Sequence, residues 1–390
     1  MTALARFLEP PRLRTPATDE VEERRATWLE LFFDLVFVAA IAQISYVLTD
    51  DLTFVGFLRY VGLFVPIWWA WMGFTFYANR FDTDDLPYRL LILLAMLAIA
   101  ALAVNVRDAL AGGSAGFALS YACVRLVLLA LYARARRHVQ QARPLATLYL
   151  GLFGTSVVLW LVSIAVPEPG RYWLWAAALT IEVSAPVFGW RLIPQAPIDP
   201  RHLPERFGLL TIIVLGESVL AVVVGTSDVQ WHVSTALAAT AGFVSAAALW
   251  WLYFDFLDDT FVGRSIVRGL VFTYANFFVV VGLASLGTGV KLAVLSTGPG
   301  SSYDDTGWVL SAGTAMFMIG LAAIQLATPP MLFDVDVWLR LGTAAFAAAL
   351  AALSSALSPP VIAGLLAASL ALQVAVELAR HEEHAGGESV

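Results

Sequence analysis

The chain has 390 residues, of which 59% are apolar and 14% are charged, whereas about 25% are charged in a typical soluble domain. Together with a mean hydropathy of +0.77, this composition excludes an ordinary water-soluble domain and indicates an integral membrane protein. The formal net charge of -7 lies largely in loops and tails, so it says little about binding partners, and no nucleic-acid partner is expected.

Mostly apolar segments of roughly 18 to 24 residues recur along the chain, and each is long enough to cross about 30 Å of hydrocarbon as a helix. The alternating strands of a membrane barrel, each about ten residues long, are missing. The sequence therefore predicts an all-α fold, a polytopic membrane helical bundle of about 12 transmembrane helices. The expected spans are 28–49, 54–78, 87–106, 115–133, 145–166, 171–188, 207–225, 233–256, 269–292, 306–328, 337–357 and 360–379.

The placement of arginine predicts the orientation of these spans. If the N-terminus lies inside, most of the 23 basic residues fall in inner segments, as is usual for cytoplasmic loops. An even number of spans then places both termini in the cytoplasm. The first apolar run begins near residue 28 and is too long for the core of a signal peptide, so we expect it to be kept as the first span.

Several features recur in the two parts of the chain. Asp34 and Glu217 each lie in a span that follows an arginine-rich segment, and Trp68 and Trp251 are separated by the same number of residues as these acids. Such matches predict two parallel six-helix repeats, although membrane helices also resemble one another by composition alone. The predicted organisation is a basic cytoplasmic tail at 1–27, a first membrane half at 28–190, a cytoplasmic linker at 191–206, a second membrane half at 207–379 and a cytoplasmic tail at 380–390.

Two carboxylates lie inside the first predicted span. Glu30 and Asp34 are four residues apart, so a helix places them on one face, one turn apart. A carboxylate in hydrocarbon is costly and usually faces a bundle interior or a watery cavity, so we predict that Asp34 binds a proton or a cation. Glu30 lies in the first turn, where a carboxylate also interacts favourably with the helix dipole, so capping explains it as well as function does.

Glu217 is the leading acid of the second half because it lies near the middle of the span 207–225. Ionising an acid at that depth is costly unless a cation is near, which suits a group that binds and releases a proton or exchanges it for a cation. The alternative is a neutral glutamic acid that forms a hydrogen bond to a neighbouring helix.

Arg125 is the basic residue placed nearest the middle of a span. It would be costly there without a partner, so we expect it to pair with Asp34, Glu182 or Glu217. Glu182 is also deep, and Pro186 one turn later could free a backbone carbonyl beside it, which is one way to line a cation or water site.

Four further residues complete the candidates. Asp255 is the acid nearest the hydrocarbon among those at the predicted inner surface, most of which should be solvated. His202, Glu205 and Arg206 lead into the span of Glu217, and they could relay protons from the cytoplasm or only cap and solvate a helix start. No cysteine and histidine cluster has the spacing of a metal site and no cofactor motif is found, so neither a metal nor a cofactor is predicted.

Two segments carry a resemblance to a known family. They are Glu30-Leu-Phe-Phe-Asp34-Leu-Val-Phe-Val and His202-Leu-Pro-Glu205-Arg206-Phe-Gly-Leu-Leu-Thr-Ile-Ile-Val-Leu-Gly216-Glu217-Ser218, with support from 77–89 and 250–255. In combination they resemble the bacterial low temperature requirement protein A (LtrA) family over about residues 28–260. The resemblance implies a polytopic protein of the bacterial inner membrane and implies no specific activity. The segment around Asp34 is also similar to the Phe-Ser-Asp helix of a cation-channel family built from six-span repeats, although its serine is missing here.

The leading functional hypothesis is a proton- or cation-coupled secondary transporter in which Asp34 and Glu217 occupy equivalent positions of the two halves and Arg125 is their internal partner. Three alternatives are an ion channel, an intramembrane enzyme that acts on a lipid or isoprenoid, and a non-catalytic membrane scaffold. An enzyme is the less favoured class because soluble-type catalytic motifs are absent. The expected partners are the lipid bilayer and a small solute or ion; the identity of the solute and the oligomeric state stay open.

Overall fold

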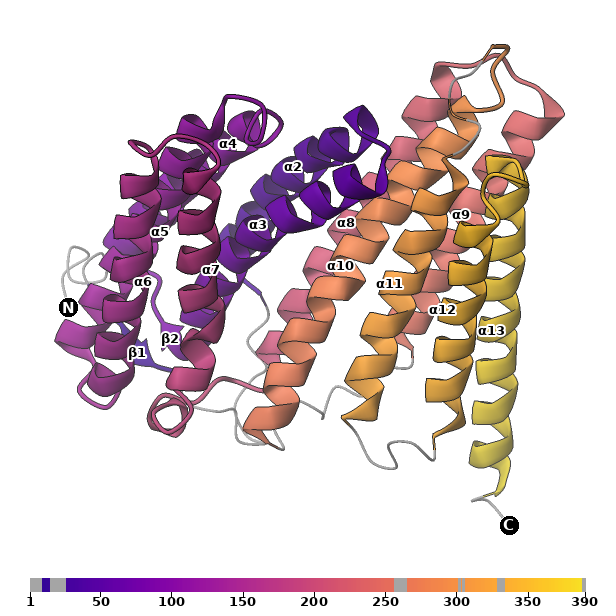
Figure 1. Ribbon diagram of the computed structural model, residues 1–390. Helices are drawn as coiled ribbons and strands as arrows, with labels where there is room; N and C mark the ends of the chain where they lie inside the picture. Colours follow the sequence, from indigo (N-terminus) through magenta and orange to yellow (C-terminus); the bar gives the residue numbers. More distant parts are fainter. Residues whose placement is uncertain are drawn as a thin grey trace. The chain divides into compact units, whose positions relative to one another are not determined.

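A computed structural model describes residues 9–14, 26–255, 265–300, 303, 306–327 and 334–387, with side chains described up to residue 380. Within these residues the chain is almost entirely helical, which confirms the predicted fold class (Figure 1). The predicted tails at 1–27 and 380–390 lie partly outside the described residues. The twelve long helices are α2 (Trp28–Asp50), α3 (Phe54–Arg80), α4 (Leu86–Val106), α5 (Ser114–His138), α6 (Arg143–Ser163), α7 (Gly170–Phe188), α8 (His202–Ser227), α9 (Val233–Phe254), α10 (Ile266–Leu295), α11 (Gly307–Leu326), α12 (Val335–Ala352) and α13 (Pro359–Gly387).

Eleven of the described helices are long and apolar enough to cross a membrane. The exception is α7, whose 19 residues include Arg171, Glu182 and Pro186. Four predicted boundaries differ from the structure by five residues or more, namely the start of α8 and the ends of α5, α12 and α13. Helix α8 begins five residues before the predicted span and takes in His202, Glu205 and Arg206 as its first turns, and α13 continues to Gly387 through the predicted C-terminal tail.

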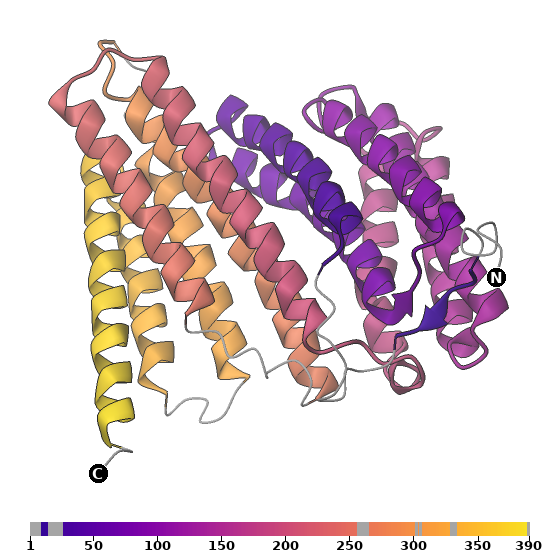
Figure 2. The same cartoon turned by 180° about the vertical axis from the view of Figure 1, so that it is seen from behind.

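The helices belong to two units, Met1–Leu209 and Leu210–Val390, and α8 crosses from one to the other. In the first unit α2 packs on α3 and α4, and α4, α5, α6 and α7 pack in chain order. In the second unit α10 packs on α9 and α11, α11 on α12, and α9 on α13, and these helices run side by side in Figures 1 and 2. When α2 and α8 are counted as the first helices, both units share the pairings of the third helix with the fourth, the fourth with the fifth and the fifth with the sixth. They also share that of the second with the sixth, α3 with α7 and α9 with α13. The repeat stays a prediction.

Side chains at the helix starts explain why the first helices begin where they do. Thr27 caps α2, because its hydroxyl accepts from the backbone N–H of Glu30 while the Glu30 carboxylate accepts from the N–H of Thr27, a capping box. Asp85 caps α4 by accepting from Tyr88 N–H, with a proline in the first turn. The explanation of Glu30 as a capping residue is therefore correct in the structure.

A short strand pair fixes part of the N-terminal segment at the end of α3. Strand β1 (Arg12–Leu13) pairs antiparallel with β2 (Phe81–Asp82), and the N–H of Arg14 donates to the carbonyl of Arg80 at 2.9 Å. The sequence analysis assigned these residues only to a basic tail. The structure shows that residues 12–14 belong to the folded first unit.

The linker after α7 is also tied to the end of α3. Its single-turn 3-10 helix η1 (Ile193–Gln195) ends at Ala196, whose carbonyl accepts from Arg80 Nε at 3.1 Å. Asn79 forms two hydrogen bonds with the backbone of Asp199, one as donor at 3.0 Å and one as acceptor at 2.7 Å. These contacts bring the first turns of α8 to α2 and α3.

Close packing in the second unit depends on glycine. A Cβ added at Gly313 of α11 would lie 2.7 Å from the carbonyl oxygen of Gly282 and 2.6 Å from the backbone nitrogen of Leu286, both on α10. Only a residue without a side chain permits backbones to approach so closely, which is how small residues stabilise helix pairs in membranes.

We therefore expect Gly313→Ala to lower the free energy of unfolding by about 1–3 kcal/mol, because the added methyl group must push α10 and α11 apart. Denaturant titration of the purified protein in detergent micelles measures this change. Gly364→Ala on α13 is the control, since a Cβ there meets nothing within 4 Å and alanine favours the helix. Equal losses in the two variants would contradict this account of the contact.

Candidate functional site

Two pairs of side chains with the same spacing face each other in the first unit. Glu30 and Asp34 lie one turn apart on α2, and His202 and Arg206 lie one turn apart on α8. Glu30 contacts His202 with 3.7 Å between Oε2 and Nε2, and Asp34 pairs with Arg206 with 2.7 Å between Oδ1 and Nη2. All four are buried, with exposed fractions of 7%, 0%, 3% and 1% respectively. We call these four residues the α2–α8 cluster.

Asp34 is held through one of its two carboxylate oxygens. Oδ1 accepts from Arg206 Nη2 and also from Trp71 Nε1, at 2.8 Å. Trp71 packs edge-on against Phe207, with 5.0 Å between ring centroids, so α3 and α8 support the same carboxylate. Oδ2 is buried and has no hydrogen-bond partner in the described part of the chain, and neither have Nε and Nη1 of Arg206.

The Glu30 carboxylate, in contrast, has several hydrogen-bond donors around it. Its Oε2 accepts from the backbone N–H of Thr27 at 2.8 Å and from the Thr27 hydroxyl at 3.2 Å. His202 is the third neighbour, and Arg206 Nη1 lies 4.0 Å away. Glu30 therefore both caps α2 and belongs to the α2–α8 cluster.

The surroundings of His202 define which ring nitrogen carries its proton. The two hydrogen bonds to Asp199 fix the side-chain amide of Asn79, so that its Nδ2 points at His202 Nδ1 from 3.5 Å. Since an amide NH2 only donates, Nδ1 acts as the acceptor and Nε2 carries the hydrogen towards Glu30. A neutral His202 satisfies both neighbours.

The net charge of the α2–α8 cluster depends on the state of His202. With His202 neutral, two carboxylates face one guanidinium, which leaves one net negative charge in a buried position. A buried charge without a partner is costly, and taking up one proton removes it.

A second buried network in the first unit is balanced. Arg125 of α5 pairs with Glu182 of α7, one of the three acids considered for it, and both are 0% exposed. Glu182 also accepts from the hydroxyls of Tyr121 and Ser156, each at 2.5 Å. Two hydroxyl donors and one cation satisfy this carboxylate, which therefore ties α5, α6 and α7 together.

The second unit holds a comparable pair that the sequence analysis did not select. Arg340 of α12 and Glu377 of α13 are buried and lie 3.2 Å apart. Gln373 donates to Glu377 at 2.7 Å and accepts from Thr343 at 2.5 Å.

The remaining candidate acids are less enclosed. Glu217 is half-buried on α8 and interacts electrostatically with Lys291 of α10, the only lysine of the chain. Asp255 is exposed at the end of α9, and its proposed ion-binding role stays a prediction. Glu205 is half-buried and accepts from the backbone N–H of Ala26 at 3.1 Å, and its role in a cytoplasmic relay stays a prediction.

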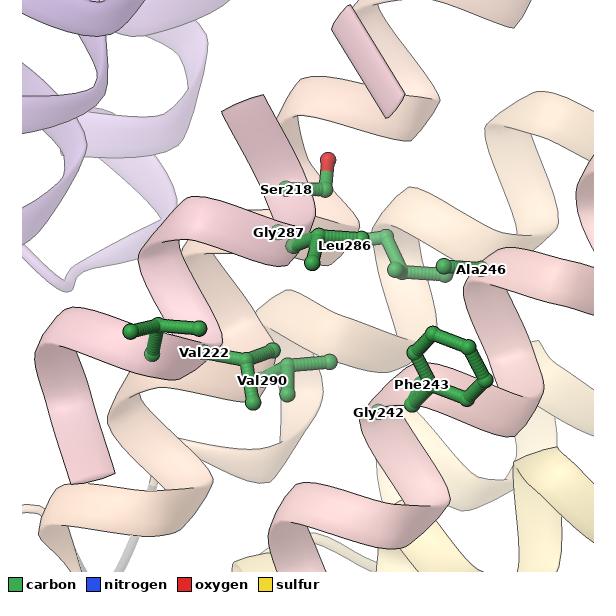
Figure 3. Close-up of a pocket in the computed structure, with 10 residues that line it drawn as sticks. Ser218, Val222, Gly242, Phe243, Ala246, Leu286, Gly287 and Val290 are labelled. Atoms are coloured by element: carbon green, nitrogen blue, oxygen red, sulfur yellow. The ribbon is translucent and has the colours of Figure 1, made fainter. Parts of the chain in front are cut away.

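An apolar pocket of about 100 Å³ lies between α8, α9 and α10 (Figure 3). Its wall includes Val222, Phe243, Leu286 and Val290, and its one hydroxyl, that of Ser218, is already donated to the carbonyl of Val214 at 3.1 Å. Glu217 does not line it. The pocket therefore offers nothing to a charged ligand. Among the described residues, no group of three or more histidine, cysteine, aspartate or glutamate side chains could hold a metal ion.

Comparison with known proteins now places the two facing segments in a family. The model of the bacterial low temperature requirement A protein (LtrA) matches residues 25–376, which covers both units. The chain belongs to the LtrA family. An uncharacterized protein of Rhizobium meliloti (strain 1021) is 30% identical over 284 residues, or 68% of each of the two chains.

The structure gives a physical reason for the two LtrA segments to occur together. The segment that begins at Glu30 and the segment that begins at His202 are far apart in the sequence, and their polar residues meet in the α2–α8 cluster. Sequence analysis assigned them to separate roles. The matching spacing of four residues in the two segments was the signal that they face each other.

Two further members of the site gave no such signal. Trp71 lies in a tryptophan-rich helix where any of several rings could have faced Asp34, and Asn79 resembles an ordinary helix-end residue. Arg125 was expected to pair with Asp34, Glu182 or Glu217, and it pairs with Glu182. It is therefore not the partner of Asp34 that the leading hypothesis assumed, and the cation of Asp34 is Arg206.

For the balanced network, we expect Glu182→Gln to lower the free energy of unfolding by about 3–5 kcal/mol, because it leaves Arg125 buried without a charge partner. Removing both charges with Arg125→Gln and Glu182→Gln should cost less than the sum of the single losses. Denaturant titration in detergent measures the three variants against Thr180→Val, an exposed position on the same helix. Strictly additive losses would contradict the pairing.

Proposed function

We propose that this LtrA-family protein is a proton- or cation-coupled secondary transporter of the bacterial inner membrane. The observation that carries the proposal is the unbalanced charge of the α2–α8 cluster. An excess negative charge in a buried cluster does not stabilise a fold, whereas a coupled transporter needs a group that is occupied by an ion in one state and empty in another.

Two other buried networks of the protein have balanced charges. Arg125 with Glu182 and Arg340 with Glu377 each join one acid to one cation, so neither has a charge to exchange. In the proposal Glu182 is therefore a structural residue, and Asp34 is the ion-binding acid of the first half. Glu217, which is half-buried and has Lys291 as its electrostatic neighbour, is the corresponding acid of the second half.

The predicted topology gives the cluster an access route. With both termini in the cytoplasm, Glu30 and His202 lie at the cytoplasmic starts of α2 and α8, one helical turn closer to water than Asp34 and Arg206. His202 and Arg206, predicted as a cytoplasmic relay, are then the groups through which an ion reaches Asp34. A channel is less well supported because Asp34 and Arg206 are fully enclosed.

The test is ion movement by the purified full chain in liposomes that contain a pH-sensitive dye. We expect an imposed gradient of Na⁺, K⁺ or a small organic solute to change the internal pH faster than in empty liposomes. Asp34→Asn and Glu217→Gln should abolish the difference, because neither amide can bind or release a proton.

Asp228→Asn is the matched control, since Asp228 is exposed after α8 and should be dispensable. Flux that is the same in wild type, Asp34→Asn and Glu217→Gln would reject the assigned roles. Proton flux that runs down its own gradient without any solute would indicate a channel instead.

A further inference from the structure

We infer that the ion bound at the α2–α8 cluster is a proton carried on Oδ2 of Asp34, and that Arg206 moves between Asp34 and Glu30 as this proton binds and leaves. The inference deepens the proposed function and rests on it for its role in coupling. It selects a proton over a metal cation and assigns Arg206 as the moving part.

The neighbours of Asp34 are suited to a proton and unsuited to Na⁺ or K⁺. A metal ion of this kind needs several oxygen ligands, whereas Asp34 faces the indole N–H of Trp71 and the guanidinium of Arg206. Both are hydrogen donors that cannot coordinate a cation, and Arg206 repels one. A proton needs only one free carboxylate oxygen.

Oδ2 of Asp34 is the free oxygen. Glu30 accepts from the backbone and hydroxyl of Thr27 and faces the Nε2 hydrogen of His202, so its carboxylate is stabilised as an anion. Nδ1 of His202 faces the fixed Nδ2 of Asn79, which only donates. With His202 neutral, a proton taken up by Oδ2 from the aqueous phase leaves the cluster without net charge, and the hydrogen bond from Arg206 Nη2 to Oδ1 is given up when the guanidinium moves to Glu30.

Arg206 has two anions within reach. Its Nη2 donates to Asp34 at 2.7 Å, while Nη1 lies 4.0 Å from Glu30 and has no hydrogen-bond partner in the described residues. When Asp34 is protonated, Glu30 is the remaining anion, so the guanidinium gains by closing that gap. Trp71 stays on Oδ1 in both states.

Other charged groups near the cluster are few. Tyr88 of α4 interacts electrostatically with Glu30 and Arg206, and Arg14 interacts with Tyr88. Tyr88 stays neutral near neutral pH, so it supplies a dipole and no charge. The groups that act on Asp34 are Arg206, Glu30 and His202.

Infrared difference spectroscopy of the full chain in lipid nanodiscs tests the inference. Acidification through the neutral range should produce the C=O band of a protonated carboxyl group, and Asp34→Asn should remove it while Asp228→Asn keeps it. In Glu30→Gln the pH at which this band appears should fall by about one unit, because Arg206 then has only Asp34 as a partner. Arg206→Gln should move it to higher pH, because the stabilising cation is lost.

Opposite shifts in these two variants are expected from the charges of Glu30 and Arg206 beside Asp34, and a residue that only supports the fold would not produce them. Replacing choline by Na⁺ or K⁺ at constant ionic strength should leave the midpoint unchanged. A midpoint that falls as Na⁺ or K⁺ rises, or a band that persists in Asp34→Asn, would overturn the inference.

The infrared measurement does not require the protein to transport anything, so it tests the inference separately from the proposed function. The expected band with no proton flux in liposomes would retain this inference and reject the proposed function. Flux that requires Asp34, combined with a midpoint that depends on Na⁺ or K⁺, would retain transport and reject the proton as the bound ion.

Discussion

The ion pair between Asp34 and Arg206 is the interaction on which the first unit depends. It joins the first helix to the start of α8, across most of the length of the unit's sequence, and it does so where neither side chain reaches solvent. Two charges in such a place stabilise each other only while both stay paired. The contacts of Trp71, Asn79 and the linker around Asp199 all hold the two partners in position.

Arg125, Arg206 and Arg340 are buried charges, and they are paired with acids in two different ways. Arg125 and Arg340 each meet one glutamate, and hydroxyl or amide groups supply further hydrogen bonds to that glutamate. Such networks fix helix positions and have no reason to change state. Arg206 instead faces two acids, one close and one slightly farther away. Within the described residues, two of its nitrogens have no hydrogen-bond partner, compared with one each in Arg125 and Arg340. In the proposed function, only the arrangement around Arg206 changes state.

The sequence was sufficient for the fold class and the family, because span length and apolar content determine whether a helix can cross a bilayer. It also selected Glu30, Asp34, His202 and Arg206 separately. The sequence could not show which of these side chains pair with one another. Three acids were equally acceptable partners for Arg125, and hydropathy does not show which helices face each other. Arg340 was misjudged for the same reason, since a charge near a helix end is read as solvated unless its partner, here Glu377, is known.

Helix α8 continues from the α2–α8 cluster in the first unit into the second unit. Arg206 lies in its second turn, in the first unit, and Glu217 lies about 16 Å farther along the same continuous helix, in the second. A helix transmits displacement along its axis because its backbone hydrogen bonds resist stretching. Arg206 and Glu217 are therefore carried by one uninterrupted run of backbone hydrogen bonds, so in the proposed function the covalent chain itself links two chemically separate acids.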